Sequence, residues 1–169
     1  MQDTISNVVN RYDLTGRYLD NIAVNELNEY FNTGLFRLQA VEIINSQVSK
    51  IIQETATKFY TEQPELLRPG GNSYTTRRYS ACLRDIEYYL RYASYALIAG
   101  NIDILSERVL DGLKDTYNSL SVPIGPTVRS IQILEEILLS KINTNNSKDI
   151  LCIKQPFEYM INILSEKNL

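Results

Sequence analysis

The sequence predicts a single all-α domain, and three observations lead to that prediction. Apolar residues recur at spacings of three and four along most of the 169 residues, which is the period of an amphipathic helix. The seven glycines and five prolines lie at breaks in this pattern rather than inside it. No segment alternates apolar with polar residues, as a half-buried strand would. The apolar share of 44% is that of a folded protein, and we expect about eight helices.

The N-terminal helix is predicted to begin after Asp3, a favourable N-cap, and to carry a short apolar stripe. This N-terminal stripe consists of Ile5, Val8, Val9 and Tyr12. About three turns of helix are too few to be stable alone in water, so the helix must dock on something. It either folds onto its own domain, which is the commoner case, or forms an interface that another chain covers.

Longer stripes follow the turn at Thr15 and Gly16, and residues 63–72, rich in proline and glycine, form the longest predicted loop. The helix after this loop is predicted to be long and to end at Gly100 in the C′ position. The stripes before the loop comprise Ala23, Leu27 and Phe31, then Val41, Ile44, Val48, Ile51 and Ile52; the long helix carries Leu83, Ile86, Leu90, Ala93 and Leu97.

The C-terminal third is predicted to hold short helical segments over residues 104–109 and 113–120, followed by a break over residues 122–126. The polar segment 143–148 has no apolar member and is expected to be a mobile surface loop. A final helix is predicted over residues 157–164. Between the break and the polar segment, an amphipathic helix carries Val128, Ile131, Leu134, Ile137 and Leu138.

Composition excludes several functions. Histidine is absent, so the chain has no Ser–His–Asp or Cys–His catalytic group, no proximal haem histidine and no histidine ligand for zinc. The net charge of −3 argues against a nucleic-acid partner, which requires a basic face. Cys82 and Cys152 are too few for a disulfide scaffold or a cysteine-only metal site, although one disulfide between them stays open. With no long apolar run and no secretory signal, we expect neither membrane insertion nor export.

Residues 77–85, at the start of the long helix, are the most informative stretch for function. One residue back from the core stripe, four side chains share a face of this helix at spacings of four, three and four. They are Arg78, Cys82, Asp85 and Tyr89, and Arg77, Arg84, Tyr88 and Arg91 flank them on a neighbouring line. The sequence therefore predicts a cationic, tyrosine-rich wall with one thiol and one carboxylate beside a core face.

Three interpretations of this wall are open. In the first, Cys82 is a small buried hydrophobe and the charges are solvated pairs of little energetic value. In the second, Cys82 is a nucleophile whose pKa the arginines lower, but no histidine can act as its base, which disfavours an enzyme. In the third, arginines pair with two carboxylates of a large conjugated ligand, Asp85 accepts from its ring N–H groups, Cys82 anchors it covalently and tyrosines pack on its faces. That ligand is a linear tetrapyrrole.

Two blocks of sequence resemble the β subunits of phycobiliproteins, specifically the allophycocyanin type. One block runs from Arg68 to Tyr92 and the other from Thr116 to Gly125, and the similarity covers nearly the whole chain. Segments 12–20, 64–69 and 125–134 are similar to a minor core variant within that family. The resemblance implies one domain over residues 1–169, a globin-like helical bundle with a two-helix N-terminal extension over about residues 1–32. It also implies a light-harvesting protein of the phycobilisome core, which passes excitation toward the photosystems, and not an enzyme.

The resemblance further implies one phycocyanobilin, joined through a thioether to Cys82. Arg78 and Arg84, with Arg77 nearby, would hold its propionates. Asp85 would bond its central pyrrole nitrogens.

Three more residues are assigned by their position in the matching blocks. Tyr88 and Tyr117 would pack on the pigment, and Asn72 matches an asparagine that the family methylates beside it. The chain departs from the family at Ser121, where glycine is usual, and we expect no effect on the pigment. Cys152 lies near the second attachment site of phycocyanin β subunits, but its flanking residues do not match that site, so we interpret it as a free or buried thiol.

Partners also follow from the resemblance. Asp13 and Arg91 match a pair that bridges the two subunits of an αβ protomer. The N-terminal stripe would then meet an α-type subunit, or the α-like domain of the core–membrane linker, within an (αβ)3 trimeric disc. The expected location is the stromal or cytoplasmic face of the thylakoid, in a red-algal plastid or, second, in a cyanobacterium. A pigment-free helical adaptor and a cysteine-dependent transferase are the alternatives from other functional classes.

Overall fold

The computed structural model describes residues 2–165, which form eight α-helices and no strand. The all-α prediction is confirmed over this range, while the ends of the predicted domain, residue 1 and residues 166–169, lie outside it. Two short helical turns lie between these helices: a 3-10 turn, η1 (Pro64–Leu67), and a π-helical turn, η2 (Ser106–Leu110). The helices are α1 (Thr4–Asp13), α2 (Asn21–Asn32), α3 (Gly34–Glu62), α4 (Thr76–Ala99), α5 (Asp103–Leu105), α6 (Leu113–Ser119), α7 (Ile124–Ile142) and α8 (Ser147–Ser165).

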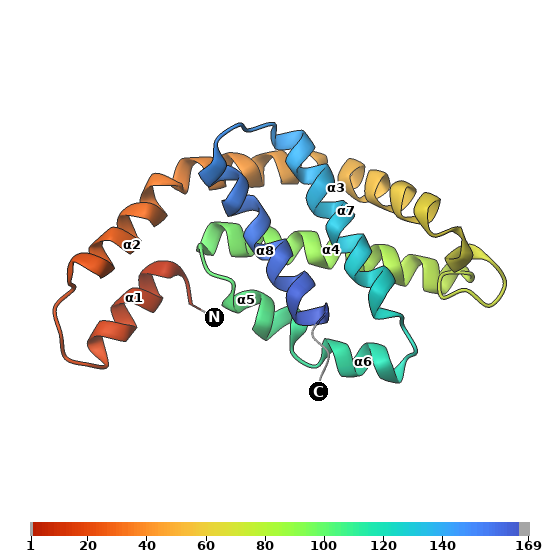
Figure 1. Ribbon diagram of the computed structural model, residues 1–169, viewed down its shortest axis with the longest axis horizontal. Coiled ribbons are helices and arrows are strands. Elements are labelled where there is room, and N and C mark those ends of the chain that lie inside the picture. Colours follow the sequence, from red (N-terminus) through yellow and green to blue (C-terminus); the bar gives the residue numbers. More distant parts are fainter. Residues whose placement is uncertain (1, 166–169) are drawn as a thin grey trace.

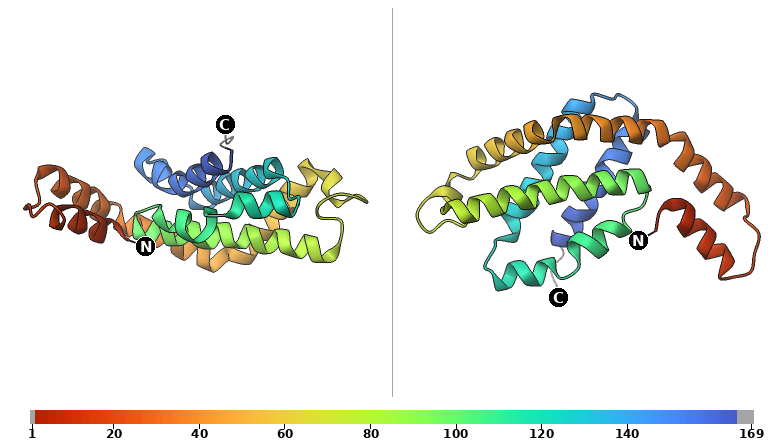
Figure 2. Two further views of the ribbon diagram at one scale, coloured as in Figure 1. Left: turned by 90° about the horizontal axis from the view of Figure 1, so that it is seen from below. Right: turned by 180° about the vertical axis from the view of Figure 1, so that it is seen from behind.

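The elements from α3 onward form a bundle of two layers, from which α1 and α2 project (Figure 1). α3 and α4 lie in one layer, and α7 and α8 lie across them in the other (Figure 2). α7 packs against α3 and α8, and α4 contacts all three of these helices. This arrangement is the globin-like bundle with a two-helix N-terminal extension that the sequence resemblance implies. Within residues 2–165 no helix combines the length and the apolar character needed to span a membrane.

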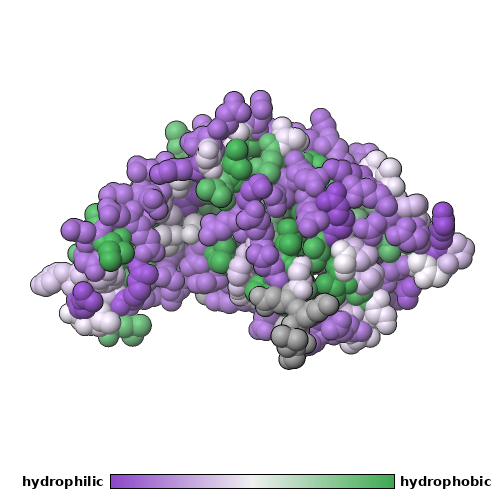
Figure 3. Space-filling view, in the orientation of Figure 1, coloured by the Kyte–Doolittle hydropathy of each residue, from purple (hydrophilic) through white to green (hydrophobic). Residues whose placement is uncertain are grey.

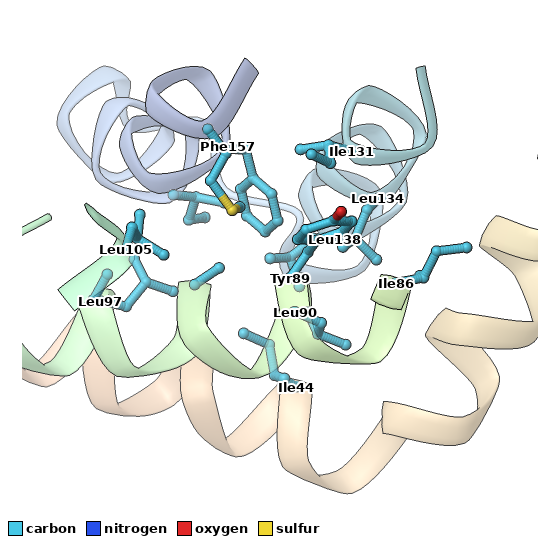
Figure 4. Close-up of a cluster of buried hydrophobic side chains, with 14 of the residues drawn as sticks. Ile44, Ile86, Tyr89, Leu90, Leu97, Leu105, Ile131, Leu134, Leu138 and Phe157 are labelled. Atoms are coloured by element: carbon cyan, nitrogen blue, oxygen red, sulfur yellow. The ribbon is translucent and has the colours of Figure 1, made fainter. Parts of the chain in front are cut away.

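One face of α4 lies at the centre of the core. Ile86, Leu90 and Leu97 are almost fully buried there and meet side chains of α3, α7 and α8 (Figure 4). Burying each such side chain contributes about 2 kcal/mol of hydrophobic stabilisation. The helix ends at Gly100, whose φ of 63° places it in the left-handed conformation typical of a glycine C-cap, as predicted.

The last helix is longer than predicted. α8 begins at Ser147 rather than at residue 157, and the predicted polar loop over residues 143–148 shrinks to residues 143–146, with only Thr144 partly shielded from solvent. Pro156 lies inside α8 although proline removes a backbone donor and is unfavourable in a helix interior. Pro156 is buried on the same helix as the fully buried Ile153 and Phe157, so apolar burial offsets the local cost.

The predicted break over residues 122–126 is also shorter. α7 begins at Ile124, with Pro123 as an extended N-cap. Pro126 lies in the first turn, where backbone N–H groups have no intrahelical acceptor, so its missing donor is not needed. Ser121, just before the helix, has a φ of 55°, a left-handed conformation that glycine adopts without strain. That conformation gives a physical reason for the glycine that is usual at this position in the family the sequence resembles.

Side chains of α1, α2 and the start of α3, which together we call the N-terminal segment, bind the carbonyl end of α4. Three side chains donate to backbone oxygens there, and one of them, Arg37, is a buried cation whose guanidinium lies 3.8 Å from the centroid of the Tyr30 ring. The carbonyl end of a helix carries partial negative charge, so a cation stabilises it. The bonds are Thr4 Oγ1 to Gly100 O (2.8 Å), Tyr30 Oη to Ile98 O (3.2 Å) and Arg37 Nη1 to Leu97 O (3.3 Å).

The N-terminal stripe is only partly covered. Val8 is fully buried, as is Ala23 of α2, so α1 docks on its own chain. Ile5 and Val9, however, remain 38% and 48% exposed. Apolar side chains of the α1–α2 pair lie on the surface among hydrophilic neighbours (Figure 3). We call the exposed set the N-terminal apolar surface; it comprises Ile5, Val9, Leu14, Tyr18, Leu19, Ile22, Val24, Phe31, Leu35 and Leu38.

Replacing Gly100 by alanine is expected to lower the free energy of unfolding by about 3 kcal/mol. The left-handed backbone is one cause; the other is that the new Cβ would lie 2.6 Å from Arg37 Nη1 and from the Tyr30 ring. Gly16→Ala is the matched control, because Gly16 has a φ of 60° but no atom within 4 Å of a Cβ. It should lose only about 1 kcal/mol in urea unfolding followed by circular dichroism. Equal losses would contradict the role given to the Arg37 contact.

Candidate functional site

A cavity of about 380 Å³ lies between the first half of α4 and the loop that joins α6 to α7. Its size is within the range of small-molecule sites. Its wall contains six of the eight residues predicted for the pigment site: Asn72, Arg77, Arg78, Cys82, Asp85 and Tyr117. The structure therefore brings together residues from the loop before α4, from α4 itself and from α6.

The other two predicted residues, Arg84 and Tyr88, do not line the cavity. Both are exposed, on the neighbouring face of α4. The Arg84 guanidinium lies 5.8 Å from the centroid of the Tyr88 ring and hydrogen-bonds to Asp85. Arg84 thus reaches the site through Asp85, and Tyr88 only through Arg84.

α4 begins with two arginines, an arrangement that helix stability does not favour. Thr75 caps the helix, its hydroxyl accepting from Arg78 N at 3.3 Å, and no acidic residue lies in the first turn. The N-terminal end of a helix carries partial positive charge, so Arg77 and Arg78 add charge of the same sign. Neither forms an ion pair with any residue in the described range 2–165. Two unpaired cations at the positive end of a helix, on a cavity wall, favour an anionic ligand.

Asp85 is the carboxylate of the cavity wall. Its Oδ2 accepts from the Tyr117 hydroxyl at 2.9 Å, and its Oδ1 accepts from Arg84 Nη2 at 3.1 Å. A carboxylate has about four acceptor positions, so both oxygens retain capacity for a further donor. This geometry suits a ligand that presents N–H groups to the middle of the cavity.

The Cys82 thiol is held in its protonated form. It lies next to Tyr60 and Ser73, whose hydroxyls hydrogen-bond to each other at 3.0 Å. Burial raises the pKa of the Cys82 thiol, and the neighbouring hydroxyls of Tyr60 and Ser73 offset part of that rise. The arginines of α4 do not lower it, contrary to the second interpretation of the wall. The thiol lacks the activation that a nucleophilic enzyme requires.

The loop before α4 is held close to η1, and this places Asn72. Ser73 N donates to Leu66 O at 2.9 Å, folding the loop back. Gly71 packs so closely that a Cβ would lie 2.4 Å from the carbonyl oxygens of Glu65 and Leu66. Only glycine fits there without a backbone shift. Asn72 follows it, half-buried on the cavity wall.

Tyr89 also lines the cavity, on the helical line with Cys82 and Asp85 where the sequence places it. The sequence assigns it no role toward the pigment, although that spacing is a signal for one. The sequence assigns no role to Ser73, which lines the cavity, or to Tyr60, which hydrogen-bonds to Ser73 behind it. These two residues come together only through the fold, so no local pattern indicates them. Among residues outside this cavity, Cys152 is free and half-buried, and burial raises the pKa of its thiol.

The predicted subunit-bridging residues lie outside the cavity on the surface. Asp13, the last residue of α1, is exposed. Arg91 is exposed on α4 and pairs with Glu87 one turn earlier. An exposed pair of this kind contributes little stability, so Arg91 remains available for another carboxylate.

No cluster of metal-ligating side chains occurs among residues 2–165.

Comparison with known proteins gives a consistent set of relatives. The family model described as "Phycobilisome protein" matches residues 7–164. Allophycocyanin subunit beta-18 of Aglaothamnion neglectum is 66% identical, and that of Pyropia yezoensis is 62% identical; each alignment covers all of both chains. A phycobiliprotein beta chain of Mastigocladus laminosus is 50% identical, again over both chains in full.

The raised thiol pKa predicts slow alkylation of Cys82 in the folded, pigment-free chain. At pH 8 iodoacetamide should react with Cys82 roughly tenfold more slowly than in the urea-unfolded chain, because less of the thiol is ionised. The rate should continue to rise above the pH at which a free cysteine levels off. Mass spectrometry of peptides labelled over a pH series measures this.

Tyr60→Phe should move that pH dependence further upward, because it removes a hydroxyl group that favours the thiolate. Tyr79→Phe is the control, since Tyr79 stacks on Tyr60 with ring centroids 5.2 Å apart. Alkylation of Cys82 at neutral pH at the unfolded-state rate would contradict the protonated thiol.

Proposed function

The chain belongs to the phycobilisome protein family and is a light-harvesting subunit of the phycobilisome core, and we propose that its covalent phycocyanobilin occupies the cavity at Cys82. One observation carries this assignment. A thiol, a carboxylate and two unpaired arginines line the same cavity. These groups match the three kinds of polar group that a linear tetrapyrrole presents: an electrophilic end, ring N–H donors and two carboxylates.

Each residue has a separate role in this proposal. Cys82 Sγ fixes one end of the pigment through a thioether. Arg77 and Arg78 pair with its propionates at the N-terminal end of α4, where the helix dipole adds to their charge. Asp85 accepts from the central ring N–H groups, and Tyr117 packs beside them. Anchoring both ends and the middle excludes the folded shapes that a flexible conjugated chain adopts in solution.

When bound, the tetrapyrrole supplies visible absorption and the excited state that passes to neighbouring pigments. The chain's own residues determine how long that state survives. A pigment held at three places has little torsional freedom, so less excitation is lost as heat. The Asp85 carboxylate also favours a positively charged conjugated system beside it, which shifts absorption to longer wavelength. Catalysis is not part of this function, and the relatives are light-harvesting pigment proteins rather than enzymes.

Three peripheral assignments complete the proposed pigment site. Arg84 acts on the pigment through its hydrogen bond to Asp85, or reaches a propionate directly after a rotamer change. Tyr88 covers the outer side of Arg84. Asn72, on the cavity wall, carries the N4-methyl group that the family places beside the bilin.

The chain pairs with an α-type partner in the phycobilisome core. We propose that the N-terminal apolar surface is the face that this partner covers, because ten large apolar side chains of α1, α2 and the adjoining segments are exposed there. Asp13 and Arg91 would bridge the two subunits by exchanging the Glu87 pair for one across the interface. The partner would be an allophycocyanin α-type subunit or the α-like domain of the core–membrane linker, within an (αβ)3 disc near the terminal emitter.

Phycobilisome proteins are peripheral to the thylakoid. The red-algal and cyanobacterial relatives support a location on the stromal or cytoplasmic face, with a red-algal plastid favoured because the most similar of the three compared chains come from Aglaothamnion neglectum and Pyropia yezoensis.

Cys82→Ser should abolish covalent pigment, and Cys152→Ser should retain it in full. Each variant is produced with the pigment and its attachment machinery, then separated on a denaturing gel and examined by zinc-induced fluorescence. The matched pair isolates the attachment position, since both residues are partly buried free thiols. A colourless native protein would favour a pigment-free helical adaptor, and colour lost only with Cys152 would overturn the assignment.

Asp85→Ala should leave the pigment attached while its long-wavelength band moves to shorter wavelength and broadens. The reason is that the variant removes the acceptor for the ring N–H groups but not the thioether. Asp85→Asn is the companion variant, because it keeps the size and one acceptor oxygen but loses the charge. An absorption spectrum identical to the parent in both variants would remove Asp85 from this role.

A further inference from the structure

A chain of three hydrogen-bonding groups connects the core to the cavity wall. The Tyr117 hydroxyl donates to Asp85 Oδ2 at 2.9 Å, and the Tyr89 and Tyr117 oxygens lie 2.5 Å apart. A phenol has only one hydrogen, and Tyr117 gives its hydrogen to the carboxylate. Tyr89 must therefore donate to the Tyr117 oxygen, so the direction of both bonds is fixed: Tyr89 to Tyr117 to Asp85.

Packing of the core does not by itself explain why residue 89 carries a hydroxyl group. Tyr89 is 3% exposed and stands among the core side chains of α4 and α7, beside Leu134 and Leu138 (Figure 4). Within the described residues, Tyr117 is the sole hydrogen-bond partner of its hydroxyl. A phenylalanine would fill almost the same volume without a polar group to satisfy. The hydroxyl is thus explained by what it does to Tyr117.

Both phenols remain donors at any physiological pH. Burial is the largest cause that raises the pKa of Tyr89 and of Tyr117, and the neighbouring Asp85 charge raises both further. A donor that is itself polarised by an incoming hydrogen bond donates more strongly, and the effect is larger in a low-dielectric interior. Tyr89 therefore strengthens the bond from Tyr117 to Asp85.

The carboxylate is consequently held at both oxygens. Oδ2 receives the Tyr117 bond from the buried side, and Oδ1 receives Arg84 Nη2 and Nε at 3.1 and 3.3 Å from the exposed side. The exposed bond is open to solvent and weak. The buried bond is the one that fixes the plane of the carboxylate relative to the cavity.

We infer that Tyr89 is a positioning residue for the pigment, acting through Tyr117 to fix the orientation of the Asp85 carboxylate. The inference rests on the proposed function only in naming the pigment as the group that Asp85 meets. The relay gives the site a rigid acceptor built from the core rather than from a surface loop.

In the pigment-loaded protein, Tyr89→Phe should shift the long-wavelength absorption band to shorter wavelength and broaden it, with the yield of attached pigment unchanged. Tyr117→Phe should produce a larger shift. Adding Tyr89→Phe to the Tyr117→Phe variant should produce no further shift, because the relay is already broken. Additive shifts in the double variant would overturn the inference, since they would mean that Tyr89 acts by local packing.

Tyr159→Phe is the matched control. Its hydroxyl lies 2.7 Å from Ser106 Oγ, away from the cavity, so the variant also removes one hydrogen bond between two side-chain hydroxyls, here a partly buried one. It should leave the band position unchanged even where it lowers the thermal midpoint. A band shift in Tyr159→Phe equal to that in Tyr89→Phe would make the effect a general one of stability and overturn the inference.

A second measurement does not require the pigment. In the full-length chain without pigment, the Tyr117 hydroxyl proton should exchange slowly and be visible by nuclear magnetic resonance. Tyr89→Phe should move this resonance toward the position of a weaker hydrogen bond, and Tyr159→Phe should not. A resonance that Tyr89→Phe leaves in place overturns the relay. Failure of the parent chain to attach pigment would instead count against the proposed function, and the resonance would still decide on the relay.

Discussion

The burial of one face of α4 is the constraint on which the rest of the structure depends. Ile86, Leu90 and Leu97 fix the rotation of this helix about its axis, because their removal from water is favourable in only one orientation. That rotation turns Cys82 and Asp85 toward the cavity rather than toward solvent. The carbonyl end of the same helix is capped by the N-terminal segment, which limits its movement along the axis. The site is therefore as rigid as the core that supports it.

The two arginines at the start of α4 differ from the cations that hold the bundle together. Arg129, for example, bonds to Glu62 of α3 and Glu136 of α7, joining two helices. At the mouth of the cavity, Arg77 and Arg78 have no such partner in residues 2–165. The thiol and the phenols nearby are protonated, since burial raises their pKa values. A site with free cations, neutral donors and one oriented carboxylate binds and holds a ligand; it does not activate a nucleophile.

Much of the fold could be predicted because its elements are strongly periodic. The stripe along α4 and the glycine at its end required only local sequence, since helical period and C-capping are local properties. The errors both concern proline. Pro126 and Pro156 were interpreted as breaks, yet one lies in the first turn of α7 and the other is buried within α8. Whether a proline ends a helix depends on where the turn begins and on what burial offsets it, and neither is visible in a short window of sequence.

The functional line on α4 was likewise predictable, because residues three and four apart share a helical face whatever the fold. By itself, the sequence determined that Cys82 and Asp85 share a face beside the core, and composition excluded histidine chemistry. Only the tertiary structure decided that the Tyr117 hydroxyl would meet Asp85, that Tyr89 would stand behind it, and that Arg84 would lie outside the cavity wall. The physical reason is that helical periodicity fixes neighbours along one helix, whereas contacts between α4 and α6 depend on how whole helices pack around a common core.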